Sequence, residues 1–95
     1  MTQRSDESAE IPITVRYFAA ARAAAGAESE TITVHPGATV AVLVDGLAER
    51  DTQFATVLSR CSYLCDGMAV RGDAAITRRL RAGETIDVLP PFAGG

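Results

Sequence analysis

The sequence contains no lysine, and its nine basic residues are all arginine. Without a lysine ε-amino group the chain cannot form a Schiff base with a carbonyl compound, nor bind phosphate as a P-loop does. Its formal net charge is −3, and the arginines are scattered along the chain. Nucleic-acid binding depends on clustered positive charge, so we expect no nucleic acid as a main partner.

Cysteine, histidine and long apolar runs are also scarce. Two cysteines, Cys61 and Cys65, and a single histidine, His35, fall short of a zinc site, so we expect no bound metal. We interpret both cysteines as ordinary core or near-core thiols rather than as a disulfide or a redox pair. No run approaches the roughly 20 apolar residues of a membrane span, and residues 1–10 lack the apolar core of a signal peptide. We therefore expect a cytoplasmic protein without membrane contact.

The 95 residues, of which 47% are hydrophobic, predict a single small folded domain. Residues 1–10 are polar and charged without periodicity, so we expect a disordered leader there. The folded domain is predicted to cover residues 11–89, and residues 90–95 are predicted to form an extended C-terminal tail.

The segment 11–18 (IPITVRYF) alternates apolar and polar side chains and predicts a strand with Ile13, Val15 and Tyr17 on one face. Because Tyr17 and Phe18 straddle this strand, one should face the core and the other solvent or a partner. Which face Phe18 takes is open, and the core is the safer prediction for it.

The remaining pattern predicts an α+β order of strand, strand, helix, short strands and last strand. After the first strand the predicted elements are a short helix (19–25), a strand (30–34), an amphipathic helix after the N-cap Thr39 (40–50), a shorter helix (51–60), two short strands around an Asp66-Gly67 turn (62–65 and 68–70) and a last strand (85–89). The last strand should alternate, with Ile86 and Val88 inward and Asp87 outward. The main helix must cover one face of the sheet, which predicts a ubiquitin-like β-grasp fold.

The last residues, Leu89-Pro90-Pro91-Phe92-Ala93-Gly94-Gly95, are the strongest functional signal. Two prolines cannot continue a sheet ladder, and residues 90–95 would reach about 20 Å when extended. Gly94 and Gly95 have no Cβ and suit a narrow channel on another protein. Phe92 is the predicted partner anchor, since aromatic residues are favoured at interface hot spots. Two alternatives stay open: a glycine-rich end that arose by chance, and a Phe92 that folds back to cap the sheet edge.

With this tail in view, the sequence resembles the small subunits of molybdopterin synthase (often called MoaD) and the related thiamine sulfur carriers. The resemblance is carried by Val15-Arg16-Tyr17-Phe18-Ala19, by the Gly37-Ala38-Thr39-Val40 helix entry, by the Asp66-Gly67 turn and by Pro90-Pro91-Phe92-Ala93-Gly94-Gly95. The sequence departs from the family in its long polar leader and in its complete lack of lysine. The lack of lysine argues against any partner contact or conjugation that the family makes through a lysine of this subunit.

This resemblance implies a sulfur carrier that is not catalytic alone and binds no cofactor itself. A partner activating enzyme would use ATP to adenylate Gly95, a persulfide would convert it to a thiocarboxylate, and Gly94 would supply clearance for threading. The acceptor would be the cyclic pterin precursor of molybdopterin on a large synthase subunit, in a heterotetramer. Partner contacts would involve Phe92, Pro90, Pro91, Ala93 and Phe18. Alternatives are a sulfur carrier for thiamine or cysteine synthesis, and a ubiquitin-like protein modifier.

Overall fold

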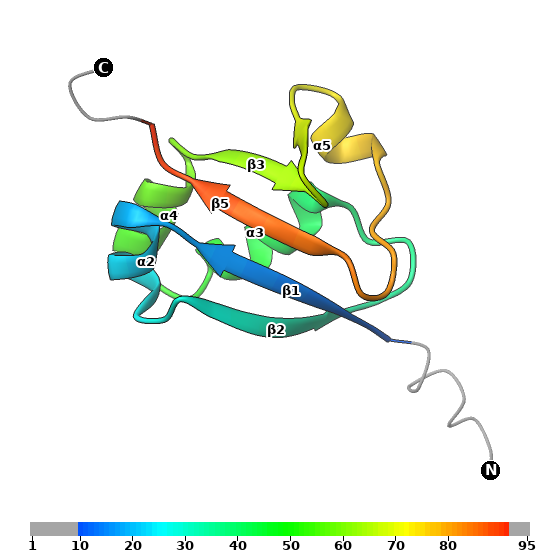
Figure 1. Cartoon of the computed structure of the whole chain (residues 1–95), viewed down its shortest axis with the longest axis horizontal. Coiled ribbons are helices and arrows are strands. Elements are labelled where there is room, and N and C mark those ends of the chain that lie inside the picture. The colour runs from blue at the N-terminus through cyan, green and yellow to red at the C-terminus, as the bar shows by residue number, and fades with distance from the viewer. Residues whose placement is uncertain (1–9, 92–95) are drawn as a thin grey trace, which may run out of the picture.

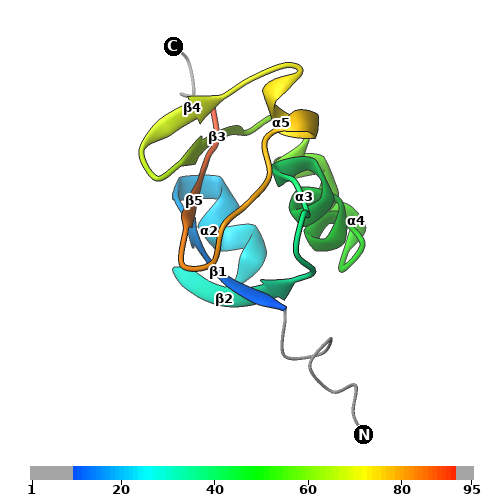
Figure 2. The ribbon, with the colours of Figure 1, turned by 90° about the vertical axis from the view of Figure 1, so that its right-hand side faces the viewer.

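The computed structural model describes residues 10–91 of the chain. In this range a five-stranded sheet is covered on one face by helices, as Figures 1 and 2 show. The elements in chain order are β1 (Ile11–Tyr17), α2 (Ala19–Ala25), β2 (Ser29–Val34), α3 (Val40–Ala48), α4 (Thr52–Leu58), β3 (Ser62–Cys65), β4 (Met68–Val70), α5 (Ala74–Thr77) and β5 (Thr85–Leu89).

The sheet is mixed, with strand order β2-β1-β5-β3-β4. The first and last strands, β1 and β5, run parallel side by side, whereas the β1–β2, β3–β4 and β3–β5 pairs are antiparallel. Strands β1 and β2 form a hairpin, as their closeness in the sequence predicts, with the short helix α2 in its loop. The predicted strand 85–89 and the ubiquitin-like β-grasp fold as a whole are confirmed.

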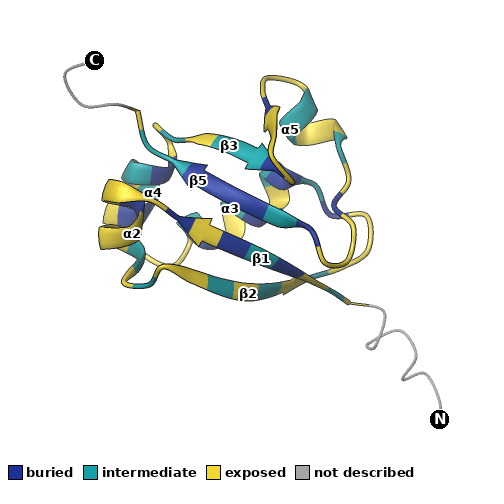
Figure 3. Cartoon of the chain, viewed as in Figure 1, coloured by how far each residue is buried: buried dark blue, intermediate teal, exposed yellow. Residues whose placement is uncertain are grey.

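The core lies between the sheet and the helices, where the buried residues of Figure 3 gather. From the sheet it receives Ile13 and Val15 of β1 and Ile86 and Val88 of β5, all with no exposed surface. Tyr17 also points inward, and its ring meets Phe54 of α4 edge to face, with ring centroids 5.7 Å apart. Period-two alternation thus placed the inner face of β1 correctly.

Local sequence explains where the elements begin and turn. The Thr39 side chain accepts a hydrogen bond from the Val42 N–H, 3.3 Å away, and so caps α3 as predicted. At the β3–β4 turn, Asp66 and Gly67 have φ of 50° and 86°. Positive φ at both central residues matches the right-handed twist of the two strands, so the Asp-Gly pair fixes this hairpin.

One sequence prediction differs from the structure in this region. The basic residues of segment 77–81 predict a turn, but Thr77 ends a four-residue helix, α5 (Ala74–Thr77), and Arg79 forms an isolated antiparallel bridge with Thr39. The outward position predicted for Asp87 is confirmed. Asp87 lies on the outer face of β5 yet is only 7% exposed. It is covered because the guanidinium of Arg16, on the neighbouring strand, forms a bidentate ion pair with the two Asp87 carboxylate oxygens, at 2.6 and 2.9 Å.

Candidate functional site

The candidate site is the end of the sheet at which β5 leaves the fold. Strand β5 lies between β1 and β3, and its last pair joins Leu89 to Ser62. Leu89 and Pro90 are half-buried, and Pro91 is exposed. Because a proline has no N–H to donate, the ladder stops at Leu89, and Pro90 and Pro91 lie outside the strand. The centre of the fold therefore anchors the start of the tail.

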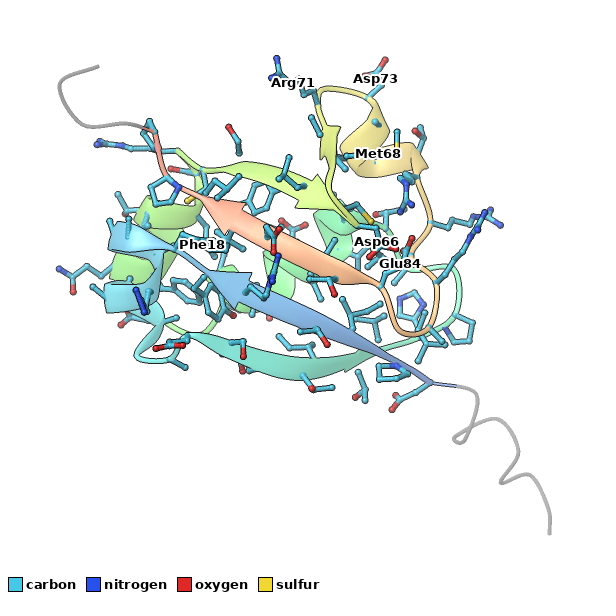
Figure 4. The ribbon with its side chains drawn as sticks, in the orientation of Figure 1. Phe18, Asp66, Met68, Arg71, Asp73 and Glu84 are labelled. Carbon is cyan, nitrogen blue, oxygen red and sulfur yellow. The ribbon has the colours of Figure 1, made fainter. Side chains whose placement is uncertain are left out.

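Phe18 lies directly beside this exit. Its backbone N–H donates to the carbonyl oxygen of Val88 at 3.2 Å, which holds Phe18 against the C-terminal end of β5. Phe18 is 38% exposed, so of the two faces that the sequence left open it takes the outer one, and the safer prediction of a core position is wrong. Tyr17 takes the core position because it shares the face of Ile13 and Val15, and Phe18 is turned outward as the residue before α2. Figure 4 shows Phe18 at this end of β1.

One arginine side chain lies beside the Phe18 ring, and a second lines the same surface pocket. The guanidinium carbon of Arg16 lies 5.8 Å from the centre of the Phe18 ring, a cation–π distance. Arg22 forms an exposed ion pair with Glu28 at 3.2 Å. A shallow surface pocket of about 240 Å³ is lined by Arg16, Phe18, Arg22 and their neighbours. Arg16 is paired with Asp87 and Arg22 with Glu28, so the exposed aromatic ring, rather than free positive charge, is what this surface offers a protein partner.

Four of the predicted site residues, Phe92, Ala93, Gly94 and Gly95, lie outside the described residues. Their roles as anchor, threading residue and sulfur-bearing terminus stay predictions. Among the described site residues, the structure brings Phe18 close to the strand that leads into Pro90 and Pro91. Because Tyr17 pairs with Val88 in register, the exposed aromatic residue and the start of the tail share one end of the sheet.

Sequence reasoning missed a partly buried polar cluster that joins the segment before β5 to the end of β3. The Arg78 guanidinium donates to both carboxylate oxygens of Glu84, at 2.7 and 3.2 Å, and to the sulfur of Cys65 at 2.8 Å. Glu84 also accepts the backbone N–H of Arg81 at 2.8 Å. The hydrogen bond from Arg78 is the main reason that the pKa of Glu84 lies below its usual value. A spacing of six residues across a loop gives no periodic signal that would have revealed this pair.

The two cysteines behave as the sequence predicted, one in the core and one near it. Cys65 is buried and Cys61 is half-buried, and both are free thiols. Burial raises the pKa of the Cys61 thiol. For Cys65, burial and then the Glu84 carboxylate raise the pKa to about 11. Both thiols therefore stay protonated near neutral pH, where a thiol is a weak nucleophile.

Residues 10–91 hold neither a cluster of metal ligands nor a membrane-spanning helix. No group of three or more histidine, cysteine or acidic side chains in this range is placed to hold a metal ion. None of the helices in the same range has the length and apolar character needed to cross a membrane.

A five-stranded mixed sheet with its helices on one face and its C-terminal strand in the centre defines a ubiquitin-like β-grasp protein. The model of the ThiS family matches residues 15–95, which is most of the chain. The chain belongs to the ThiS family. No significant match was found among curated proteins.

Solved structures support the same class. The putative molybdopterin converting factor subunit 1 of Pyrococcus furiosus is 26% identical, with a TM-score of 0.74 over 86% of this chain and 99% of that one. Two further structures show the fold alone. Small archaeal modifier protein 1 of Methanosarcina acetivorans has a TM-score of 0.74 at 20% identity, over 90% of this chain and 98% of that one. A chain in the complex of subunits 1 and 2 of the molybdopterin-converting factor of Helicobacter pylori has a TM-score of 0.61 at 19% identity, over 90% of this chain and 100% of that one. The fold is thus that of sulfur carriers and ubiquitin-like modifiers.

Proposed function

We propose that this protein is the sulfur-carrier subunit of a molybdopterin synthase. The observation that carries the proposal is the course of β5: the central strand of the sheet leads into Pro90-Pro91-Phe92-Ala93-Gly94-Gly95. Membership of the ThiS family and likeness to a putative molybdopterin converting factor subunit 1 support it. The diproline and phenylalanine favour molybdopterin over thiamine synthesis as the destination of the sulfur.

The chemistry needs an activated C-terminus, because a carboxylate is a poor acyl donor. A partner enzyme transfers AMP from ATP to the Gly95 carboxylate and releases pyrophosphate. The terminal sulfur of a persulfide then attacks the acyl carbon, AMP leaves, and reduction of the resulting acyl disulfide by a thiol frees the thiocarboxylate. The Gly95 thiocarboxylate gives its sulfur to a carbon of the pterin precursor and returns to a carboxylate when water replaces the sulfur.

The contribution of this chain to that reaction is delivery. Its single histidine, His35, follows β2 at the end of the sheet where Val34 pairs with Ile11. The tail starts at the opposite end, beside Tyr17, so His35 is not placed to act as a base for Gly95. A small reactive group on a narrow tail that enters a partner's active site lowers the entropic cost of the attack.

Two partners follow from this role. One is a large synthase subunit that holds the pterin precursor, and the structure of subunits 1 and 2 of the converting factor from Helicobacter pylori supports such a pairing. The other is an ATP-dependent activating enzyme that adenylates Gly95. A heterotetramer of two carriers on a dimeric large subunit is the proposed assembly, and the cytoplasm is its proposed location.

The terminal glycine offers the direct test of this role. Deletion of Gly95, or Gly95→Ala, should abolish sulfur transfer to the precursor in a reconstituted synthase assay, because the reactive group moves or no longer fits the channel. The free energy of unfolding should stay within about 0.5 kcal/mol of the parent, since the change touches no core residue. Thiocarboxylate yields equal to those of the parent chain would contradict the proposal.

The exposed aromatic residues should anchor the large subunit. Phe18→Ala and Phe92→Ala should each weaken binding by about 1–3 kcal/mol, measured by calorimetry, because truncation empties a partner pocket. Met68→Ala is the matched control, since Met68 is 73% exposed and lies at the β3–β4 turn, at the opposite end of β3 from the pair that Ser62 forms with Leu89. Equal affinities for all three variants would rule out the anchor role.

A ubiquitin-like modifier is the second candidate, favoured by the similar fold of small archaeal modifier protein 1. Both candidates require adenylation of Gly95 and separate at the next step. A carrier yields a free thiocarboxylate, whereas a modifier yields an isopeptide bond between Gly95 and a lysine of a target protein. The chain itself has no lysine, so it cannot receive such a bond on a lysine side chain.

A further inference from the structure

The outer edge of the sheet at β2 carries a groove that the proposed delivery of sulfur does not use. Strand β2 ends the strand order, and within residues 10–91 no strand pairs with its outer side. The groove has a volume of about 190 Å³ and runs between β2 and α3. It is lined mainly by Ile32 and Val34 of β2 and by Val42, Leu43 and Leu47 of α3. Figure 2 shows β2 at the edge of the sheet on the side of α3.

A glycine in the middle of α3 keeps this groove open. Gly46 lines it, and a Cβ added there would meet no atom within 4 Å. Packing inside the chain therefore does not require a glycine at this position. Because glycine is among the poorest residues for a helix interior, its presence here is not explained by the stability of α3 either. Val42, one turn earlier, is 44% exposed although it is apolar. The space is lined by apolar groups and is left unfilled by the described residues.

The charges around the groove discriminate between its possible occupants. Arg50 closes one end, but Glu30 neutralises it through contacts of 2.8 and 3.1 Å. Asp45 and Glu49 are exposed, and at helical spacing they follow the solvent side of Val42 and Gly46. If two copies paired through their β2 edges, their α3 helices would lie on the same face of the joined sheet and bring these carboxylates together. Like charges so placed disfavour a second copy and favour a basic partner.

We propose that the edge of β2 and the groove under α3 bind an extended, basic segment of a partner protein by strand addition. Backbone N–H and C=O groups of the partner pair with β2, as in other proteins that extend a sheet with a bound peptide. Alternate aliphatic side chains of the segment enter the groove beside Ile32, Val34 and Val42. Lysine or arginine side chains at the two ends of the segment, flanking the aliphatic ones, reach Asp45 and Glu49 on the same face of the sheet. This surface lies at the opposite edge of the sheet from β3 and β4, so a partner can occupy it while β5 presents the tail.

The test uses the full chain and a synthetic nine-residue peptide that has alternating valine and threonine in its centre and two lysines at each end, and that is blocked at both ends. Amide chemical shifts in a nitrogen-15 NMR titration should move in Ser29–Val34 and in Val42–Arg50. The same peptide with glutamate in place of lysine should bind about tenfold more weakly at low salt, because it meets the acidic rim. No binding of the lysine peptide at about 1 mM, or shifts confined to other strands, would overturn the proposal.

Position 46 supplies a matched pair of variants. Gly46→Leu fills the groove and should weaken the lysine peptide about tenfold, whereas Gly46→Ala leaves most of the space and should change its affinity less than about threefold. A third variant, Asp45→Lys with Glu49→Lys, should reverse the preference toward the glutamate peptide. Cooperative thermal unfolding of each variant verifies the fold. Equal binding by the leucine and alanine variants, or a dimer in sedimentation that Gly46→Leu abolishes, would overturn the basic partner.

Discussion

Glu84 shows how a single buried charge ties together segments that the sequence keeps apart. It is 6% exposed, and it joins Arg78, the Arg81 backbone and, through Arg78, the Cys65 thiol of β3. Removal of one partner from such a pair leaves the other group without its counter-charge, which costs more than the pair itself contributes. The cluster thereby fixes the loop between α5 and β5 against the β3–β4 hairpin.

This cluster predicts a dependence of stability on pH. Because the pKa of Glu84 is lowered in the folded protein, its contribution to stability is present above the unfolded pKa and is lost as the pH falls through the folded pKa. Between about pH 6 and pH 3 the urea midpoint of the parent should therefore fall more than that of Glu84→Gln. At pH 7 this substitution should cost about 1–3 kcal/mol, since Arg78 loses a charged acceptor.

The matched control for this experiment is Glu28→Gln, because the Glu28 side chain is 80% exposed and pairs only with the half-exposed Arg22. It should lower the free energy of unfolding at pH 7 by less than about 0.5 kcal/mol. Equal pH profiles for the parent and for Glu84→Gln would show that the Arg78–Glu84 pair does not contribute to folding stability.

What could be predicted at the residue scale depended on distance along the chain. Alternation placed Ile13, Val15 and Tyr17 inward, because neighbouring residues of a strand report the face directly. The Arg16–Asp87 pair joins residues 71 positions apart, and only the parallel pairing of β1 with β5 brings them together. The face of Phe18 could not be decided from the sequence, because it depends on the start of α2 rather than on the alternation of β1.

At the scale of elements, capping residues set the boundaries of the helices that pack on the sheet. Asp51 begins α4, and its carboxylate accepts the Phe54 N–H at 3.0 Å. The predicted helices over 40–50 and 51–60 are confirmed as α3 and α4. Each is shorter than predicted, because residues 49–50 and 59–60 form turns at the ends of the two helices. The short helix α5 was missed, since it has four residues and its N-cap side chain makes no capping bond.

The cap of α4 gives a prediction at this scale. Asp51→Ala should lower the free energy of unfolding by about 1 kcal/mol, because the Phe54 N–H loses its acceptor. Asp51→Asn keeps an oxygen at the same place and should retain most of the stability. Urea denaturation at pH 7 measures both, and an alanine variant as stable as the asparagine variant would show that the cap is not stabilising.

At the scale of the whole molecule, the fold separates the two regions for which we propose partner contacts. The β5 exit, with Phe18 beside it, lies at one end of the sheet, and the groove of β2 and α3 lies along one side. The β-grasp fold and the use of β5 as the last strand could be predicted from the sequence because helix and strand periods alternate clearly. The groove could not, since it depends on how α3 sits over β2.

The proposed role of Gly95 as the sulfur-bearing terminus is open to a single decisive measurement, the intact mass of the chain. The chain is isolated from cells that contain the activating enzyme and is weighed before and after treatment that hydrolyses thiocarboxylates. We expect a fraction heavier by about 16 Da, the replacement of one oxygen by sulfur, located in the Gly94-Gly95 peptide and lost on hydrolysis. A terminus that stays a plain carboxylate even with ATP, a sulfur donor and the activating enzyme supplied would contradict this role.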